Sequence, residues 1–214
     1  MVRAVFPGTF DPIHYGHIDI TKRAARLFDE VVVAVYDKPI KKLLFSPEER
    51  IDLVKKSLNS LKNVRVTGYS GLTVDYCHEI DAQVIVRGLR VFSDFEYEFR
   101  MALANHRLAP DIEVVALITN NDHTFLSGTT VREIASLNGD VSSMVPGIVD
   151  QALKRRFEEL GQNQNVVLEP CSNGVLPLKS SGICFRLDQF LGVFFPYAIA
   201  LGQGGDCVSP NSLG

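Results

Sequence analysis

The sequence has no tryptophan and no hydrophobic segment long enough to cross a membrane. The apolar run Phe190–Leu201 is 12 residues long and is interrupted by a glycine and a proline, whereas a transmembrane helix needs about 20 residues. The first residues, Met1–Gly8, lack the apolar segment of a signal peptide. We therefore expect a protein that is neither embedded in a membrane nor secreted.

Cysteine spacings that bind metals or catalyse redox reactions are also missing. No CxxC pair and no cysteine–histidine spacing typical of a metal site occurs among the four cysteines. The cysteines are Cys77, Cys171, Cys184 and Cys207. The simplest setting for them is the reduced cytoplasm, and no residue is predicted as a metal ligand.

An excess of positive charge is absent as well. The chain has 22 Lys plus Arg against 25 Asp plus Glu, which gives a net charge of −3. This balance argues against a protein that coats nucleic acid through bulk charge, while it permits a local basic pocket. Charged residues at 22% and hydrophobic residues at 46% are typical of a globular chain and exclude a wholly disordered one.

Charge is distributed unevenly along the 214 residues. Residues 1–160 contain 42 of the 47 charged side chains and all five histidines, whereas residues 161–214 contain five charges and half of the 16 glycines. We therefore predict a domain over 1–160, followed by a tail over 161–214 that is poorly ordered or adventitious and dispensable for activity. A small docked element is the alternative for this tail.

The domain over 1–160 alternates between two hydrophobic periods. Short apolar runs predict strands buried on both faces: Val2–Phe6, Val31–Tyr36, Val64–Thr67, Val84–Val86 and Ile112–Ile118. Helical periodicity predicts helices between and after them: Ile18–Phe28, one that starts at Ser46-Pro47-Glu48-Glu49, Thr73–Ile80, Phe92–Leu108 and Val149–Leu160. This alternation predicts an α/β fold with a Rossmann-like, doubly wound, parallel five-stranded sheet and helices on both faces.

The chemistry-bearing segment with the clearest pattern, Phe6–His17, follows the first predicted strand. It contains neither a P-loop nor a GxGxxG motif. Instead, His14 and His17 stand three residues apart where a helix is expected to begin, so they share one face of its first turn. Gly16 lets a ligand approach the backbone. Two imidazoles beside a helix N-terminus predict an anion site at the carboxyl end of the first strand.

The segments Gly8–Pro12 and His14–His17 resemble the (T/H)xGH signature of the nucleotidyltransferase superfamily. Within it, residues 1–160 are similar to the bacterial phosphopantetheine adenylyltransferase family. The resemblance implies transfer of the adenylyl group of ATP to 4′-phosphopantetheine, which gives dephospho-coenzyme A and pyrophosphate. It also implies that Mg²⁺ is the cofactor and that the protein is a homohexamer in the cytoplasm. Its implied partners are the small-molecule substrates, and neither nucleic acid nor a membrane is expected as a partner.

Further segments support the resemblance and carry its implied site residues. The implied catalytic residues are His17, Lys41 and Arg90. The implied phosphopantetheine-binding residues are Thr9, Lys41, Thr73 and Arg87. The implied ATP-binding residues are Thr9, Phe10, His14, His17, Gly88, Leu89, Arg90, Glu98, His123, Thr124, Phe125, Leu126, Ser127, Gly128 and Thr129.

Several of these residues also have a purely structural interpretation. Lys41 lies in a basic pair typical of a solvated face, Glu98 lies in a helix whose acidic first turn favours the dipole, and Thr130 to Glu133 read as a capping box. Gly128 and His123 depart from the family pattern, in which serine and an aromatic residue such as tryptophan are common. The backbone site at that helix N-terminus is expected to persist.

Two alternatives remain at this point. Another superfamily enzyme, such as a nicotinate mononucleotide adenylyltransferase or a cytidylyltransferase, shares the first motif. A non-catalytic nucleotide-binding module is the second. A class I tRNA synthetase shares a related motif, but neither a KMSKS-like loop nor an anticodon domain is found, which argues against it. Because the nucleophile of the implied reaction is an already ionised phosphate, no general base is expected.

Overall fold

A computed structural model describes residues 1–38, 43–164, 176–177 and 184–185. It divides the chain into two compact units, Met1–Gln164 and Asn165–Gly214. The first unit contains a five-stranded sheet in the order β3-β2-β1-β4-β5, and every neighbouring pair in it is parallel. Its strands are β1 (Arg3–Gly8), β2 (Glu30–Tyr36), β3 (Val64–Tyr69), β4 (Val84–Leu89) and β5 (Glu113–Ile118).

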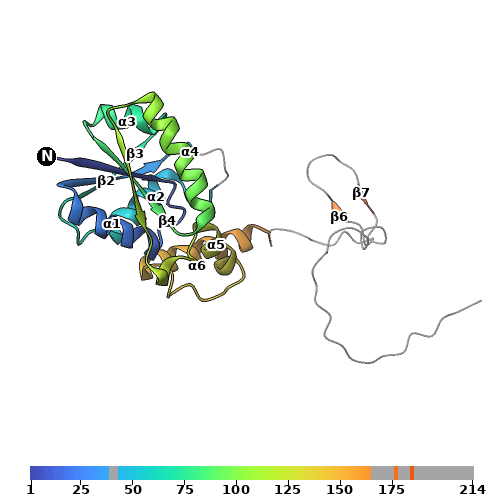
Figure 1. Cartoon of the computed structure of the whole chain (residues 1–214). Coiled ribbons are helices and arrows are strands. Elements are labelled where there is room, and N and C mark those ends of the chain that lie inside the picture. Colours follow the sequence, from blue (N-terminus) through green and yellow to red (C-terminus); the bar gives the residue numbers. More distant parts are fainter. Residues whose placement is uncertain (39–42, 165–175, 178–183, 186–214) are drawn as a thin grey trace, which may run out of the picture. The chain divides into compact units, whose positions relative to one another are not determined.

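Helices follow the strands and cover both faces of the sheet (Figure 1). They are α1 (Tyr15–Leu27), α2 (Pro47–Ser57), α3 (Thr73–Glu79), α4 (Phe92–Leu108), α5 (Gly128–Ser136) and α6 (Gly147–Gln164), with a 3-10 turn η1 (Asn121–His123). The predicted capping box of α2 is present: Ser46 Oγ accepts a hydrogen bond from the Glu49 amide at 3.3 Å, and the Glu49 carboxylate accepts one from the Ser46 amide at 2.8 Å. The predicted doubly wound fold is confirmed.

Alternation along the strands produces two separate cores. In β2, Val31, Val33 and Val35 belong to the core shared with α1, α2, α5 and α6. Val32 and Ala34 face the other side, where they pack with residues of α3 and of the segment after α4. Because successive side chains of a strand point to opposite faces, a continuous apolar run is what a strand buried on both faces requires.

Three element boundaries differ from the sequence prediction by three residues or more. Helix α1 begins at Tyr15 and not at Ile18, because its first turn is built from the polar motif and not from apolar residues. Strand β4 runs to Leu89 instead of ending at Val86. Helix α6 continues to Gln164, past the predicted domain end at residue 160, because the prediction stopped at its last apolar residue.

The crevice that holds the site follows from the strand order and register. Strand β1 pairs with β2 over six residues, from Arg3 to Gly8, but with β4 only at Ala4 and Val5. Pro7 has no N–H to donate and interrupts the pairing. The strands β1 and β4 therefore separate toward their carboxyl ends, at the position where the strand order reverses and where ligands bind in open α/β sheets.

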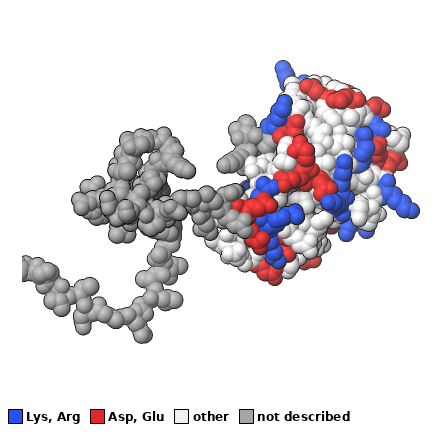
Figure 2. Space-filling model, turned by 180° about the vertical axis from the view of Figure 1, so that it is seen from behind, with Lys and Arg blue, Asp and Glu red and all other residues white. Residues whose placement is uncertain are grey.

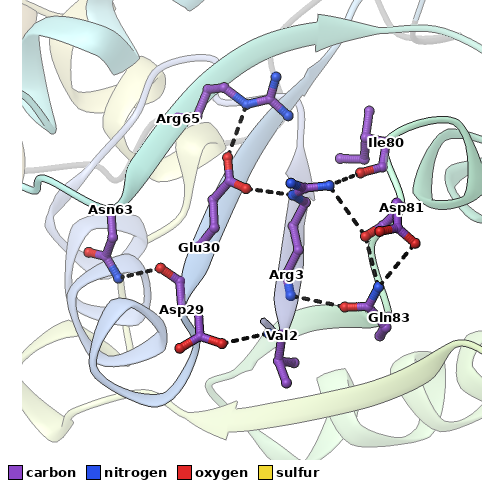
Figure 3. A network of polar contacts seen from close by, with 9 residues as sticks. All are labelled: Val2, Arg3, Asp29, Glu30, Asn63, Arg65, Ile80, Asp81 and Gln83. Atoms are coloured by element: carbon purple, nitrogen blue, oxygen red, sulfur yellow. Dashed lines mark hydrogen bonds and ion pairs between the residues drawn. The ribbon is translucent and has the colours of Figure 1, made fainter.

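A polar network holds the amino ends of the strands together at the opposite edge of the sheet (Figure 3). Arg3 Nε donates to Glu30 at 2.5 Å, and its Nη1 donates to the Ile80 carbonyl. The same Glu30 carboxylate is 3.4 Å from Arg65, while the Arg3 amide donates to Gln83 at 3.0 Å. These groups satisfy one another, so this edge carries a structural network.

Charges of both signs are interspersed on the face of the first unit shown in Figure 2, in agreement with the near-balanced composition. Among the helices in the described part of the chain, none is long and apolar enough to span a membrane. In the second unit, β6 (Leu176–Pro177) pairs antiparallel with β7 (Cys184–Phe185). The predictions made for the tail, residues 161–214, fall outside the described ranges except at residues 161–164, 176–177 and 184–185.

Candidate active site

A cavity of about 630 Å³ lies at the carboxyl edge of the sheet, between the ends of β1 and β4. It contains most of the predicted site residues that the structure describes. These are Thr9, Phe10, His14, His17, Thr73, Arg87, Gly88, Arg90, Glu98, Ser127 and Gly128. The tertiary fold thus brings together segments that lie more than 100 positions apart in the sequence.

The two histidines of the motif stack on each other at the start of α1. Their ring centroids are 3.7 Å apart with an interplanar angle of 24°. His14 occupies the N-cap position, and its backbone N–H donates to Nδ1 of His17 at 3.3 Å. A Cβ on Gly16 would lie 3.1 Å from the His14 ring. Glycine at this position therefore allows the His14 ring to lie against the backbone and beside His17.

Both imidazoles are held neutral. Burial, followed by the charges of Arg90 and His123, lowers the pKa of His14 to about 3. Burial, followed by electrostatic interaction with His14 and Arg90, lowers the pKa of His17 well below its ordinary value. In a neutral imidazole one nitrogen accepts and the other donates. Because Nδ1 of His17 accepts from the backbone, its Nε2 carries the proton and is the nitrogen that can donate to a ligand.

Phe10, which follows β1, packs against the ring of His17. Phe10 is buried with φ of 48°, and its ring meets the His17 ring edge-on at a centroid distance of 4.9 Å. A Cβ on Gly8 would lie 3.0 Å from the Phe10 ring, so glycine makes room for this aromatic contact. Thr9 stands between Gly8 and Phe10 in the sequence and is exposed at the cavity wall.

Arg87 and Glu98 form a bidentate ion pair in the cavity wall. Nε and Nη2 of Arg87 each lie 2.6 Å from a Glu98 oxygen. The guanidinium also donates to the Pro7 carbonyl at 3.3 Å, at the point where β1 and β4 part. Glu98 therefore holds Arg87 in place at the cavity wall.

Arg90 follows β4 and is fixed on two sides. Its Nε and Nη2 lie 3.0 Å and 3.2 Å from the carboxylate of Asp94, and its Nη1 donates to the Leu126 carbonyl at 2.8 Å. It lines the same cavity as His17. The cavity thus contains a fixed guanidinium and a neutral imidazole donor, which suits a site for an anion whose charge changes during a reaction.

The N-terminus of α5 forms another part of the wall. Ser127 is its N-cap, and its Oγ accepts from the Thr130 amide at 3.0 Å. The helix therefore starts before the capping box expected at Thr130–Glu133. A Cβ on Gly128 would lie 3.0 Å from the Asp11 carbonyl oxygen, which gives a structural reason for glycine where the family pattern has serine. Backbone N–H groups at a helix N-terminus attract phosphate.

Some predicted ATP-binding residues do not line the cavity. Leu126 is fully buried and Phe125 is 58% exposed. The His123 ring lies 6.3 Å from that of Tyr15, and its charge contributes to the lowered pKa of His14. The others outside the lining are Leu89, Thr124 and Thr129. Lys41, predicted as catalytic and substrate-binding, lies outside the residues that the structure describes.

Several residues of the cavity wall were not predicted from the sequence. Tyr36 and Tyr69, the last residues of β2 and β3, have ring centroids 5.3 Å apart. The Tyr69 hydroxyl is 3.0 Å from Oγ1 of Thr73. The remaining missed residues include Phe6, Pro7, Ile20, Tyr97, Met101 and Thr119. The position of the two tyrosines at strand carboxyl ends could have indicated them, since these ends meet at one edge of a parallel sheet.

A second cavity of about 70 Å³ lies beside the Arg87–Glu98 pair. Its wall includes the apolar side chains of Ile85, Ala102 and Val114. In the described part of the chain, no group of three His, Cys, Asp or Glu side chains is placed to hold a metal ion. Glu98, the carboxylate of the main cavity wall, is already engaged by a guanidinium.

Comparisons with known proteins indicate the family and the fold of this chain. The Cytidylyltransferase-like family model matches residues 5–134. A solved structure from Vibrio parahaemolyticus, provisionally named a nicotinate-nucleotide adenylyltransferase, superposes with a TM-score of 0.56 at 20% identity. That match covers 72% of this chain and 99% of the other, and at this identity it supports the fold alone.

Curated relatives are much more similar in sequence. The phosphopantetheine adenylyltransferase of Roseiflexus castenholzii is 54% identical over 157 residues, which cover 73% of this chain and 98% of the relative. That of Dictyoglomus thermophilum is 48% identical over 157 residues, which cover 73% of this chain and 96% of the relative. The chain therefore belongs to the phosphopantetheine adenylyltransferase family, within the cytidylyltransferase-like proteins.

Proposed function

We propose that this protein transfers the adenylyl group of ATP to 4′-phosphopantetheine, with dephospho-coenzyme A and pyrophosphate as products. The observation that supports this most is the single cavity that contains His17, Arg87, Arg90 and the N-terminus of α5. Two polyanions have to meet for this reaction, and the cavity gathers cationic and N–H donors from several strand ends.

The reaction needs stabilisation of charge more than it needs proton transfer. The attacking phosphate of phosphopantetheine is already ionised at neutral pH, so no general base is required. Charge increases on the oxygens around the α-phosphate and on the departing pyrophosphate. Nε2–H of His17 and the guanidinium of Arg90 are the donors that we assign to this charge, together with the predicted Lys41.

The two substrates occupy opposite ends of the cavity in this proposal. The triphosphate lies toward Arg90 and the N-cap of α5 at Ser127, where free backbone N–H groups and the helix dipole favour phosphate. The phosphate of phosphopantetheine lies toward Arg87 and Thr9. The small cavity beside Arg87, whose wall has both polar and apolar side chains, would receive part of the pantetheine arm.

Magnesium enters this proposal as part of the nucleotide substrate. The described residues provide no carboxylate cluster that could hold the ion by itself, and Mg²⁺ commonly binds through substrate phosphates and retained waters. We therefore assign the MgATP complex as the form that binds, in which the ion neutralises phosphate charge. Since ATP is the substrate, we place the enzyme in the cytoplasm.

We also propose that the protein is a homo-oligomer, namely the hexamer that the family resemblance implies. Helix α4 exposes large apolar side chains, each 40–60% accessible: Tyr97, Phe99, Met101, Leu103 and Leu108. Apolar patches of this kind mark interaction surfaces. Light scattering on wild type and on a Leu103→Glu variant tests this assignment, because a monomeric wild type would contradict it and a smaller variant assembly would support it.

Pyrophosphate release on mixing MgATP with 4′-phosphopantetheine tests the function. We expect turnover with this pair and none when nicotinate mononucleotide or glycerol phosphate replaces phosphopantetheine. Turnover with nicotinate mononucleotide alone would assign the chain to another nucleotidyltransferase activity. ATP binding without pyrophosphate release from any pair would indicate a non-catalytic module.

A further inference from the structure

Arg50 is a buried arginine outside the cavity that ligands would occupy. Its exposed fraction is 1%, and it lies in the first turns of α2. Its guanidinium donates to three backbone carbonyls, those of Thr9 at 2.7 Å, Tyr36 at 2.8 Å and Phe45 at 3.3 Å. Arginine is rarely buried so completely without a specific function for its hydrogen bonds.

The three acceptors belong to separate parts of the chain. Thr9 follows β1, Tyr36 ends β2, and Phe45 precedes α2. Thr9 and Tyr36 both line the main cavity, whereas Arg50 does not. One planar, rigid guanidinium therefore fixes the positions of two walls of the cavity relative to each other and to α2.

Asp11 also binds the segment before α2 that contains Phe45. Its buried carboxylate accepts N–H groups from Leu44 at 2.8 Å and Phe45 at 3.0 Å. Burial lowers the pKa of Arg50, and the carboxylates of Asp11, Asp37 and Glu48 counteract this effect. Because an arginine guanidinium is not deprotonated in proteins, its charge-assisted bonds to the carbonyls are strong ones.

We propose that Arg50 is a positioning residue for the transfer reaction: it holds Thr9 and Tyr36 in the geometry that aligns the two substrates. This inference rests on the proposed function. The effect passes through the backbone of Thr9, whose side chain is assigned to the attacking phosphate. A misplacement of about 1 Å at such a position costs about 100-fold in rate.

The test compares Arg50→Lys and Arg50→Met with wild type in steady-state turnover of MgATP and phosphopantetheine, per folded molecule as measured by circular dichroism. Lysine keeps the charge but lacks the planar fork. We expect kcat to fall by about 100-fold in both variants, with little change in either KM. In an Arg50→Ala variant, added guanidinium ion should restore part of the lost kcat.

Arg156→Lys is the matched control. Arg156 also reaches this region, where its guanidinium lies 5.4 Å from the centroid of the Phe45 ring and pairs with Glu49, but it contacts neither Thr9 nor Tyr36. We expect its kcat to equal that of wild type, and guanidinium ion to leave the kcat of Arg156→Ala unchanged.

The outcomes separate this inference from the function on which it rests. A wild type that does not release pyrophosphate would refute the proposed function. If the wild type is active and the folded Arg50 variants have the same kcat as the wild type, the positioning role is overturned. Arg50 variants that never fold, including the lysine variant, would also overturn it and leave Arg50 as a residue of stability alone.

Discussion

Acid should destabilise this protein through the pair of histidines at the start of α1, of which His14 is buried. In the unfolded chain His14 titrates near 6.5, whereas in the folded protein burial and the charge of Arg90 lower its pKa to about 3. Between these values the unfolded chain binds a proton that the folded protein does not. The stabilisation is therefore complete above pH 6.5 and is lost as the pH falls from 6.5 toward 3.

The size of the effect follows from the width of this pH window. One pKa unit corresponds to about 1.36 kcal/mol, so at about pH 5 the loss from His14 alone is about 2 kcal/mol of unfolding free energy. His17, whose pKa is also well below its ordinary value, adds to this loss. Because 2 kcal/mol is a large part of a typical domain's stability, the shift is measurable.

Urea unfolding of wild type and His14→Thr, at about pH 7 and about pH 5, measures this contribution. Threonine is the residue that the (T/H)xGH signature itself allows at this position. We expect wild type to lose about 2 kcal/mol more than the variant between the two pH values, while His106→Gln, at an exposed position of α4, behaves like wild type. Equal losses in wild type and His14→Thr would show that His14 takes up its proton in the folded state.

Further predictions concern the cavity and the tail. His17→Ala should lower kcat by about 100-fold or more, as expected for loss of one aimed donor, with an unchanged circular dichroism spectrum; near-normal turnover would remove His17 from the mechanism. Arg87→Ala should raise KM for phosphopantetheine by about 10- to 100-fold, the scale of a charge-assisted bond, and KM for ATP much less; equal increases would contradict its assignment. Gly128→Ala should cost about 1 kcal/mol of stability through overpacking against Asp11 and weaken ATP binding, as measured by calorimetry; unchanged values of both would show that the α5 terminus adjusts freely. Truncation after Gln164 should preserve kcat, and a loss of turnover would give the tail a role.

Local patterns in the sequence were sufficient to predict the elements and the class of the fold. Apolar runs such as Val31–Tyr36 indicate strands buried on both faces, and the capping box at Ser46 marks the start of α2. These signals are local because hydrogen bonding and side-chain direction repeat every two or 3.6 residues. The motif with His14 and His17 indicated the anion site, and the resemblance it carries predicted the family that the comparisons confirm.

Contacts between distant residues were decided only by the tertiary structure. No periodicity indicates that Glu98 pairs with Arg87, or that Arg50 donates to Thr9 and Tyr36. Arg87 and Glu98 meet because α4 packs against the end of β4, and Arg50 reaches both Thr9 and Tyr36 because β1 and β2 run side by side to their carboxyl ends. The sequence by itself therefore determined which side chains are available for chemistry. The fold decided which of them line the cavity and which hold the others in place. The reason is that a hydrogen bond depends on distances between segments that no single segment defines.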